Sequence, residues 1–217
     1  LPPTAHRVER RGGWHGGRLQ KRVRSVQAWK VHKFGGSSVA DAACMERVAK
    51  IIENDPAPRK AVVLSACRGV TDALLTLIGL AEQGLPALDD RLQELRQRHV
   101  GIARELLAGE LCDQYIAALD ADCRDIAGIL QTVRLVRNAS TTMRDLISGY
   151  GEIWSTRLFE RLLRRRAAGH VQWLDARQAL LVEWGPMGPG VRWDQSRAQM
   201  AALVPPEFVG TLAVTGF

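Results

Sequence analysis

The chain begins, after its first 28 residues, with two strand-like runs that are each followed by a helical pattern. WKVHKF (29–34) alternates polar and apolar residues, and KAVVLSA (60–66) is a nearly continuous apolar run of the kind found in buried parallel strands. Helical periodicity follows at 39–55 and 73–83. The alternation of strands and helices predicts an α/β fold with a parallel sheet.

The first helix is expected to be capped by Ser38 and to end at the Asn-Asp-Pro run near residue 55. A helical projection places six apolar residues close to one another, and this face is predicted to be buried: Val39, Ala42, Ala43, Val48, Ile51 and Ile52.

Helical patterns without strand signals fill the middle of the chain. The segments 87–107 and 112–138 predict an antiparallel helical hairpin. Their expected buried stripes are Leu92, Leu95, His99, Ile102 and Leu106 in the first, and Ile116, Leu119, Cys123, Ile126, Ile129, Leu130 and Val133 in the second.

A third helix is predicted after a Thr141-Thr142 cap and contains two glycines, Gly149 and Gly151. Because a glycine in a helix interior costs about 1 kcal/mol relative to alanine, the pair indicates either a break or a close backbone approach. The Arg164–Arg166 run is read as a solvated helix end. Strands are expected at 171–176 and 211–217, with a Gly/Pro-rich loop between them.

The positive charge of the chain is concentrated at its N-terminus. The formal net charge is +7, of which residues 1–24 supply +6. Residues 1–28 are therefore predicted to form a basic, disordered arm, and residues 29–217 to form the folded part. If such an arm has a role, we expect weak RNA binding through phosphate contacts. Nucleic acid is nevertheless not the expected partner of this protein.

Two classes of protein are disfavoured by composition. The sequence has no apolar run of about 18 residues, so no membrane span is expected. The four cysteines form no C-x-x-C pair, and neither they nor the histidines show metal-ligand spacing. We therefore expect reduced, buried thiols, no protein metal site and a cytoplasmic location.

Lys33 lies two residues before the Gly35-Gly36-Ser37-Ser38 turn, and this group has the parts of an anion site. Glycines leave backbone N–H groups accessible to phosphate oxygens, a following helix adds partial positive charge, and the lysine adds a full one. The spacing of a P-loop is absent. On these residues alone, an ordinary turn with a solvated lysine remains an open alternative.

A second loop, Ser65 to Asp72, also follows a strand and precedes a helix. In a parallel sheet the carboxyl ends of the strands meet at one edge, where ligands bind. The two glycine-containing loops are therefore expected to converge on one polar ligand.

Five segments, taken in order, resemble aspartokinases: KFGGSSV, VVLSACRGVTDALL, SGYGEIWS, WLDAR and VTGF. The resemblance implies the amino-acid kinase (carbamate kinase-like) fold, a three-layer α/β/α sandwich with a mainly parallel central sheet. It also implies transfer of the ATP γ-phosphoryl group, with Mg²⁺, to the side-chain carboxylate of L-aspartate. The product is 4-phospho-L-aspartate, on the route to lysine, threonine and methionine.

The resemblance also assigns roles to residues. It implies that Lys33 is catalytic, that Ser65 and Thr71 orient aspartate, and that Glu152 pairs with its ammonium group, with no protein metal ligand. The implied ATP- and phosphate-binding residues are Lys33, Phe34, Gly35, Gly36 and Ser37.

Two departures from the family pattern are visible. The family more often has threonine where this chain has Ser37, and its members continue after the Thr-Gly-Phe strand into a segment that supplies further substrate and nucleotide contacts. We therefore expect an N-terminal part of the catalytic domain, inactive by itself, from a parent that is a homo-oligomer. Two alternatives stay open: another amino-acid kinase with glutamate or acetylglutamate as acceptor, and a non-catalytic module that binds nucleic acid through its arm.

Overall fold

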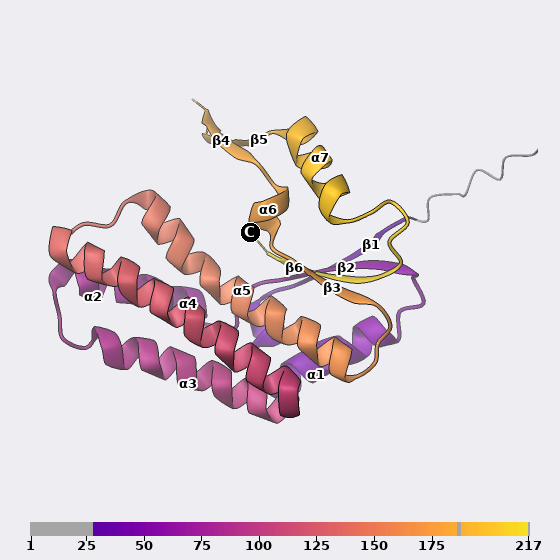
Figure 1. Cartoon of the computed structure of the whole chain (residues 1–217), viewed down its shortest axis with the longest axis horizontal. Helices are drawn as coiled ribbons and strands as arrows, with labels where there is room; N and C mark the ends of the chain where they lie inside the picture. The colour runs from indigo at the N-terminus through magenta and orange to yellow at the C-terminus, as the bar shows by residue number, and fades with distance from the viewer. Residues whose placement is uncertain (1–27, 186–187, 217) are drawn as a thin grey trace, which may run out of the picture.

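The computed structural model describes residues 28–185 and 188–216, so nearly all of the predicted arm lies outside the described residues. Its centre is a four-stranded parallel sheet in the order β1-β2-β6-β3 (Figure 1). The predicted parallel α/β sheet is confirmed. The strands are β1 (Lys30–Phe34), β2 (Arg59–Leu64), β3 (Val171–Leu174) and β6 (Gly210–Thr215), with a separate antiparallel pair, β4 (Val182–Gly185) and β5 (Gly188–Val191).

The two faces of the sheet bury different cores. Val62, Leu64 and Ala213 belong to the larger core, whereas Leu174 and Leu212 belong to a smaller one. Figure 1 shows α1 and α5 on one side of the sheet and α6 and α7 on the other, which gives three layers. The helices are α1 (Ala42–Glu53), α2 (Val70–Gln83), α3 (Leu88–Leu106), α4 (Gly109–Val136), α5 (Thr141–Arg165), α6 (Ala176–Ala179) and α7 (Trp193–Leu203).

Helices α2 to α5 form a bundle that extends beyond one end of the sheet (Figure 1). The predicted α3–α4 hairpin is confirmed, and its two helices are separated by only Leu107 and Ala108. Every residue of the stripe predicted in α3 is buried, while Ile116 and Ile129 of the α4 stripe are partly buried against the same core. The apolar stripes fill this core and so hold α5, which crosses from the bundle to the sheet.

The first helix differs from its prediction at the start and on one face. Gly36–Val39 form a 3-10 turn (η1), and α1 is capped by Asp41, which accepts a hydrogen bond from the Cys44 amide at 2.8 Å. Ser38 is therefore not the cap. Ala43 and Ile51 are exposed rather than buried, because the buried face is centred on Met45, Ala49 and Ile52, and at about 100° per residue Ala43 and Ile51 point away from it.

Helix α5 passes through Gly149 and Gly151 without a break, and Ser140 caps it in place of the predicted threonines. Of the two interpretations of the glycines, the break is excluded, and the close approach is found at Gly151. The terminal arginine run is not simply solvated, because Arg166 makes ion pairs with Glu46 and Glu53 of α1. These ion pairs tie the end of α5 to α1.

The Gly/Pro-rich stretch between β3 and β6 contains more structure than the predicted loop. It forms α6, the β4–β5 hairpin and α7. Strands of four residues that consist partly of glycine and proline carry too little hydrophobic pattern to be recognised from sequence.

Candidate functional site

The loops after β1 and β2 lie side by side at the carboxyl edge of the sheet, as expected. The Ser65 amide donates to the Phe34 carbonyl at 3.1 Å, and the Arg68 amide donates to the Gly36 carbonyl at 3.0 Å. A Cβ atom added to Gly36 would lie 2.7 Å from the Ala66 carbonyl oxygen. Glycine is thus required at residue 36 because another backbone occupies the space of a side chain.

Lys33 lies at the exposed end of β1, one residue before its final residue. Gly35 and Ser37 are also exposed in the turn that follows, whereas the Phe34 side chain is half-buried and packs against the larger core. Because η1 intervenes, the amino end of α1 lies after this turn and is occupied by the Asp41 carboxylate. The partial positive charge expected from α1 at the glycines is therefore displaced along the chain.

Glu152 lies in the middle of α5, where it is half-buried. Burial raises the pKa of its carboxyl group above the usual value, and the nearby positive charge of Lys33 opposes this rise. The structure therefore brings Lys33 and Glu152 within electrostatic reach of each other, although 119 positions separate them in the sequence. A half-buried carboxylate of this kind is suited to binding an ammonium group.

Ser65 is connected to the same helix. The Ser155 hydroxyl, three residues after Glu152, donates to the Ser65 carbonyl at 2.7 Å. Thr71 is exposed in the first turn of α2, and its neighbour Val70 contacts α5 at Gly151. Sequence reasoning missed Ser155, and its only signal was a serine on the buried side of a helix.

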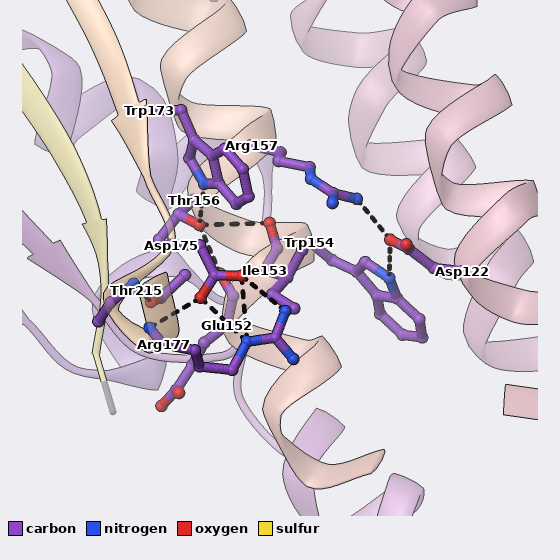
Figure 2. A network of polar contacts seen from close by, with 11 residues as sticks. Asp122, Glu152, Ile153, Trp154, Thr156, Arg157, Trp173, Asp175, Arg177 and Thr215 are labelled. Atoms are coloured by element: carbon purple, nitrogen blue, oxygen red, sulfur yellow. Dashed lines mark hydrogen bonds and ion pairs between the residues drawn. The ribbon is translucent and has the colours of Figure 1, made fainter. Parts of the chain in front are cut away.

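A polar network contacts the backbone of α5 at Glu152 (Figure 2). The Thr156 hydroxyl donates to the Glu152 carbonyl at 2.7 Å and accepts from the Trp173 indole at 2.9 Å. The Arg157 guanidinium lies 4.9 Å from the Trp173 ring centroid and pairs with Asp122 of α4 at 2.6 Å. The network joins α4, α5 and β3 and so restricts the position of Glu152.

A second polar cluster lies beside this network, at the carboxyl ends of β3 and β6 (Figure 2). Asp175 caps α6 and holds Arg177 in a salt bridge with a shortest distance of 2.6 Å. The Thr215 hydroxyl of β6 accepts from the Ala176 amide at 2.8 Å. The WLDAR segment that contains this pair is part of the resemblance to aspartokinases, but no role was expected for its residues.

Two other sequence expectations concern cysteines and metals. The four cysteines are buried and unpaired, as predicted. Burial raises the pKa of the Cys67 thiol to about 11, so this loop residue is protonated at neutral pH.

Residues 28–185 and 188–216 contain no cluster of three His, Cys, Asp or Glu side chains that could hold a metal ion. The described helices also include none that is long and apolar enough to cross a membrane.

The fold and the sequence together define the class of protein. The sequence profile of the amino acid kinase family matches residues 28–214, and the chain belongs to this family. Its curated relatives are aspartokinases. The chain is 31% identical over 154 residues to the bifunctional aspartokinase/homoserine dehydrogenase 1, chloroplastic, of Zea mays, an alignment that covers 71% of this chain and 17% of the relative.

Similarity extends to bacterial enzymes. Lysine-sensitive aspartokinase 3 of Escherichia coli K12 is 31% identical over 175 residues, which make up 80% of this chain and 36% of the relative. The crystal structure of E. coli aspartokinase III with aspartate and ADP superimposes with a TM-score of 0.72 at 28% identity, covering 86% of this chain and 40% of that one. The same enzyme with lysine and aspartate gives a TM-score of 0.71 at 27% identity. The expected amino-acid kinase fold is thus confirmed, and the chain spans less than half of these relatives.

Proposed function

We propose that this chain is part of an aspartate kinase, which transfers the γ-phosphoryl group of ATP to the side-chain carboxylate of L-aspartate. The observation that carries the proposal is that an exposed lysine and a half-buried glutamate, Lys33 and Glu152, lie within electrostatic reach of each other at the carboxyl edge of a parallel sheet. The solved E. coli relative with aspartate and ADP supports the choice of both substrates.

Lys33 would act on the phosphoryl group in transfer. Phosphoryl transfer depends mainly on positioning and on neutralisation of the charge carried by the phosphoryl oxygens. Lys33 is exposed near the end of β1, two residues before the Gly35-Gly36 turn, so its ammonium group and the turn amides can approach the same oxygens. Phe34 would contribute through its backbone, because its side chain packs into the core.

Glu152, Ser65 and Thr71 would bind aspartate. The Glu152 carboxylate would pair with the substrate ammonium, and the hydroxyls of Ser65 and Thr71 would donate to its carboxylates. Because the loops after β1 and β2 lie side by side, the substrate side chain would lie near the glycine turn, where the phosphoryl group would be held.

Mg²⁺ would enter with ATP and neutralise charge on its phosphates. The described residues contain no cluster of three His, Cys, Asp or Glu side chains for it, and Lys33 and the turn amides would bind the phosphates beside it. Cytoplasmic location, assembly into a homo-oligomer, and a place in lysine, threonine and methionine synthesis are further parts of the proposal. Buried free thiols are typical of proteins in reducing compartments and support the first of these.

The test is formation of acyl-hydroxamate from ATP, Mg²⁺ and hydroxylamine by the protein expressed from its complete reading frame, with aspartate, glutamate and acetylglutamate compared as acceptors. We expect product with aspartate only. Product with glutamate or acetylglutamate in its place would assign another acceptor to the same site. Absence of product with all three, from a folded protein, would overturn the proposal.

A further inference from the structure

Ser155 lies at the point where α5 touches the loop after β2. Its side chain is fully buried, and its hydroxyl oxygen lies 2.7 Å from the Ser65 carbonyl oxygen and 3.1 Å from the Glu152 carbonyl oxygen. The hydrogen bond to Ser65 joins residues 90 positions apart. It is therefore a tertiary contact, not an ordinary bond within a helix.

The neighbouring contacts determine where the single hydroxyl proton goes. The Glu152 carbonyl already accepts from the Thr156 hydroxyl at 2.7 Å. Because a serine hydroxyl has only one proton to donate, the shorter contact to Ser65 takes it. Ser155 thus satisfies a carbonyl of the substrate loop, while Thr156 satisfies that of Glu152.

We infer that Ser155 is a positioning residue that sets the distance between Ser65 and Glu152 and thereby the affinity for aspartate. The inference rests on the proposed function, in which these two residues bind the same substrate molecule. Ser155 itself is buried, and it acts through the backbone of Ser65.

A second contact between α5 and the loop explains why the Ser155 hydrogen bond affects the position of the loop. One turn earlier on α5, Gly151 lies directly against the side chains of Ala66 and Val70. No side chain separates the helix from the loop there, so movement of the loop against α5 is limited by van der Waals contact on one side and by the Ser155 bond on the other. Removing the bond frees the loop to move away from Glu152.

The variant Ser155→Ala removes the donor, and Ser155→Cys replaces it with a slightly larger group that is a weaker donor. Ser148→Ala is the matched control, because Ser148 lies on the same helix and its hydroxyl donates within that helix, to the Asp145 carbonyl at 3.0 Å. The KM values for aspartate and for ATP are measured for each variant in the complete protein, together with kcat and the melting temperature.

We expect Ser155→Ala to raise the KM for aspartate by up to about tenfold, the factor that corresponds to the free energy of one hydrogen bond if all of it is lost from aspartate binding, with the KM for ATP within about twofold. Ser155→Cys should lie between Ser155→Ala and wild type, and Ser148→Ala should match wild type. A general loss of folded protein would lower kcat without this selective change in KM.

Equal changes in both KM values, or an unchanged KM for aspartate in both variants at position 155, would overturn the inference while leaving the proposed function intact. If Ser155→Ala does not fold, the KM values of Ser155→Cys test the inference by themselves. A folded wild type that phosphorylates none of the acceptors would overturn the proposed function and, with it, the inference. The activity of the wild type therefore distinguishes failure of the inference from failure of the proposed function.

Discussion

Gly151 of α5 and Ala66 of the loop after β2 touch so closely that a Cβ atom added to Gly151 would lie 2.8 Å from the Ala66 Cβ. The same added atom would lie 3.1 Å from Cγ1 of Val70. Both partners are fully or nearly fully buried, and so have little space into which to move. The glycine is what allows the helix that carries Glu152 to lie against the loop that carries Ser65.

The variant Gly151→Ala should destabilise the protein by about 1–3 kcal/mol, because the added methyl overpacks this contact. The measurement is the free energy of unfolding in urea. Gly128→Ala on α4 is the control, since a Cβ atom there meets nothing within 4 Å. The control should be neutral or stabilising by up to about 1 kcal/mol, and similar values for the two variants would contradict the proposed close approach.

The variant Lys33→Ala should lower kcat by on the order of 10³ or more, because the transition state loses the cation that neutralises phosphoryl oxygens. Hydroxamate formation measures this effect. Lys30→Ala is the control, since Lys30 lies on the same strand but pairs with Asp55 at 2.7 Å. Comparable loss in the two variants would show that the strand, and not the Lys33 charge, is responsible.

The variant Glu152→Gln should raise the KM for aspartate by about 10- to 100-fold, through loss of a charged partner for the substrate ammonium. Because burial raises the pKa of Glu152, the wild-type carboxylate is protonated as the pH falls through a value above that of an ordinary glutamate. The KM of the wild type should therefore increase on the acid side, and that of Glu152→Gln should change less there. Glu94→Gln, at an exposed pair on α3, should behave like wild type.

His99 should make the protein less stable in mild acid. Its ring is fully buried, with Nδ1 3.0 Å from the Leu95 carbonyl oxygen and the Trp154 ring in an edge contact, and burial lowers its pKa from 6.5 to about 4. Because the unfolded chain binds the proton first, stability is lost as the pH falls from about 6.5 to about 4, by up to about 3 kcal/mol.

The variant His99→Leu should remove this part of the pH dependence, measured as the free energy of unfolding in urea at several pH values. His170→Asn, at an exposed histidine, serves as the control and should retain the wild-type slope. A wild-type slope in His99→Leu would show that other groups cause the acid sensitivity.

The long helices and the parallel sheet could be predicted from the sequence because their signals are local. Leu92, Leu95 and His99 repeat at helical spacing, and KAVVLSA is apolar throughout, so burial on one helix face or on both faces of a strand follows from the order of residues. The start of α1 and the small elements between β3 and β6 depend on weaker signals. There, a 3-10 turn moved the cap from Ser38 to Asp41, and a hairpin formed in a stretch rich in glycine and proline.

By itself, the sequence determined the two glycine loops, the lysine beside the first, and the family to which their order points. Only the tertiary structure decided which groups meet: the Lys33 charge beside Glu152, and the Ser155 hydroxyl on the Ser65 carbonyl. Periodicity describes which side of an element is buried, but it does not specify which residue of a distant element fills the space opposite. That choice depends on how α5 crosses the sheet edge, and the crossing is set by packing along the whole bundle.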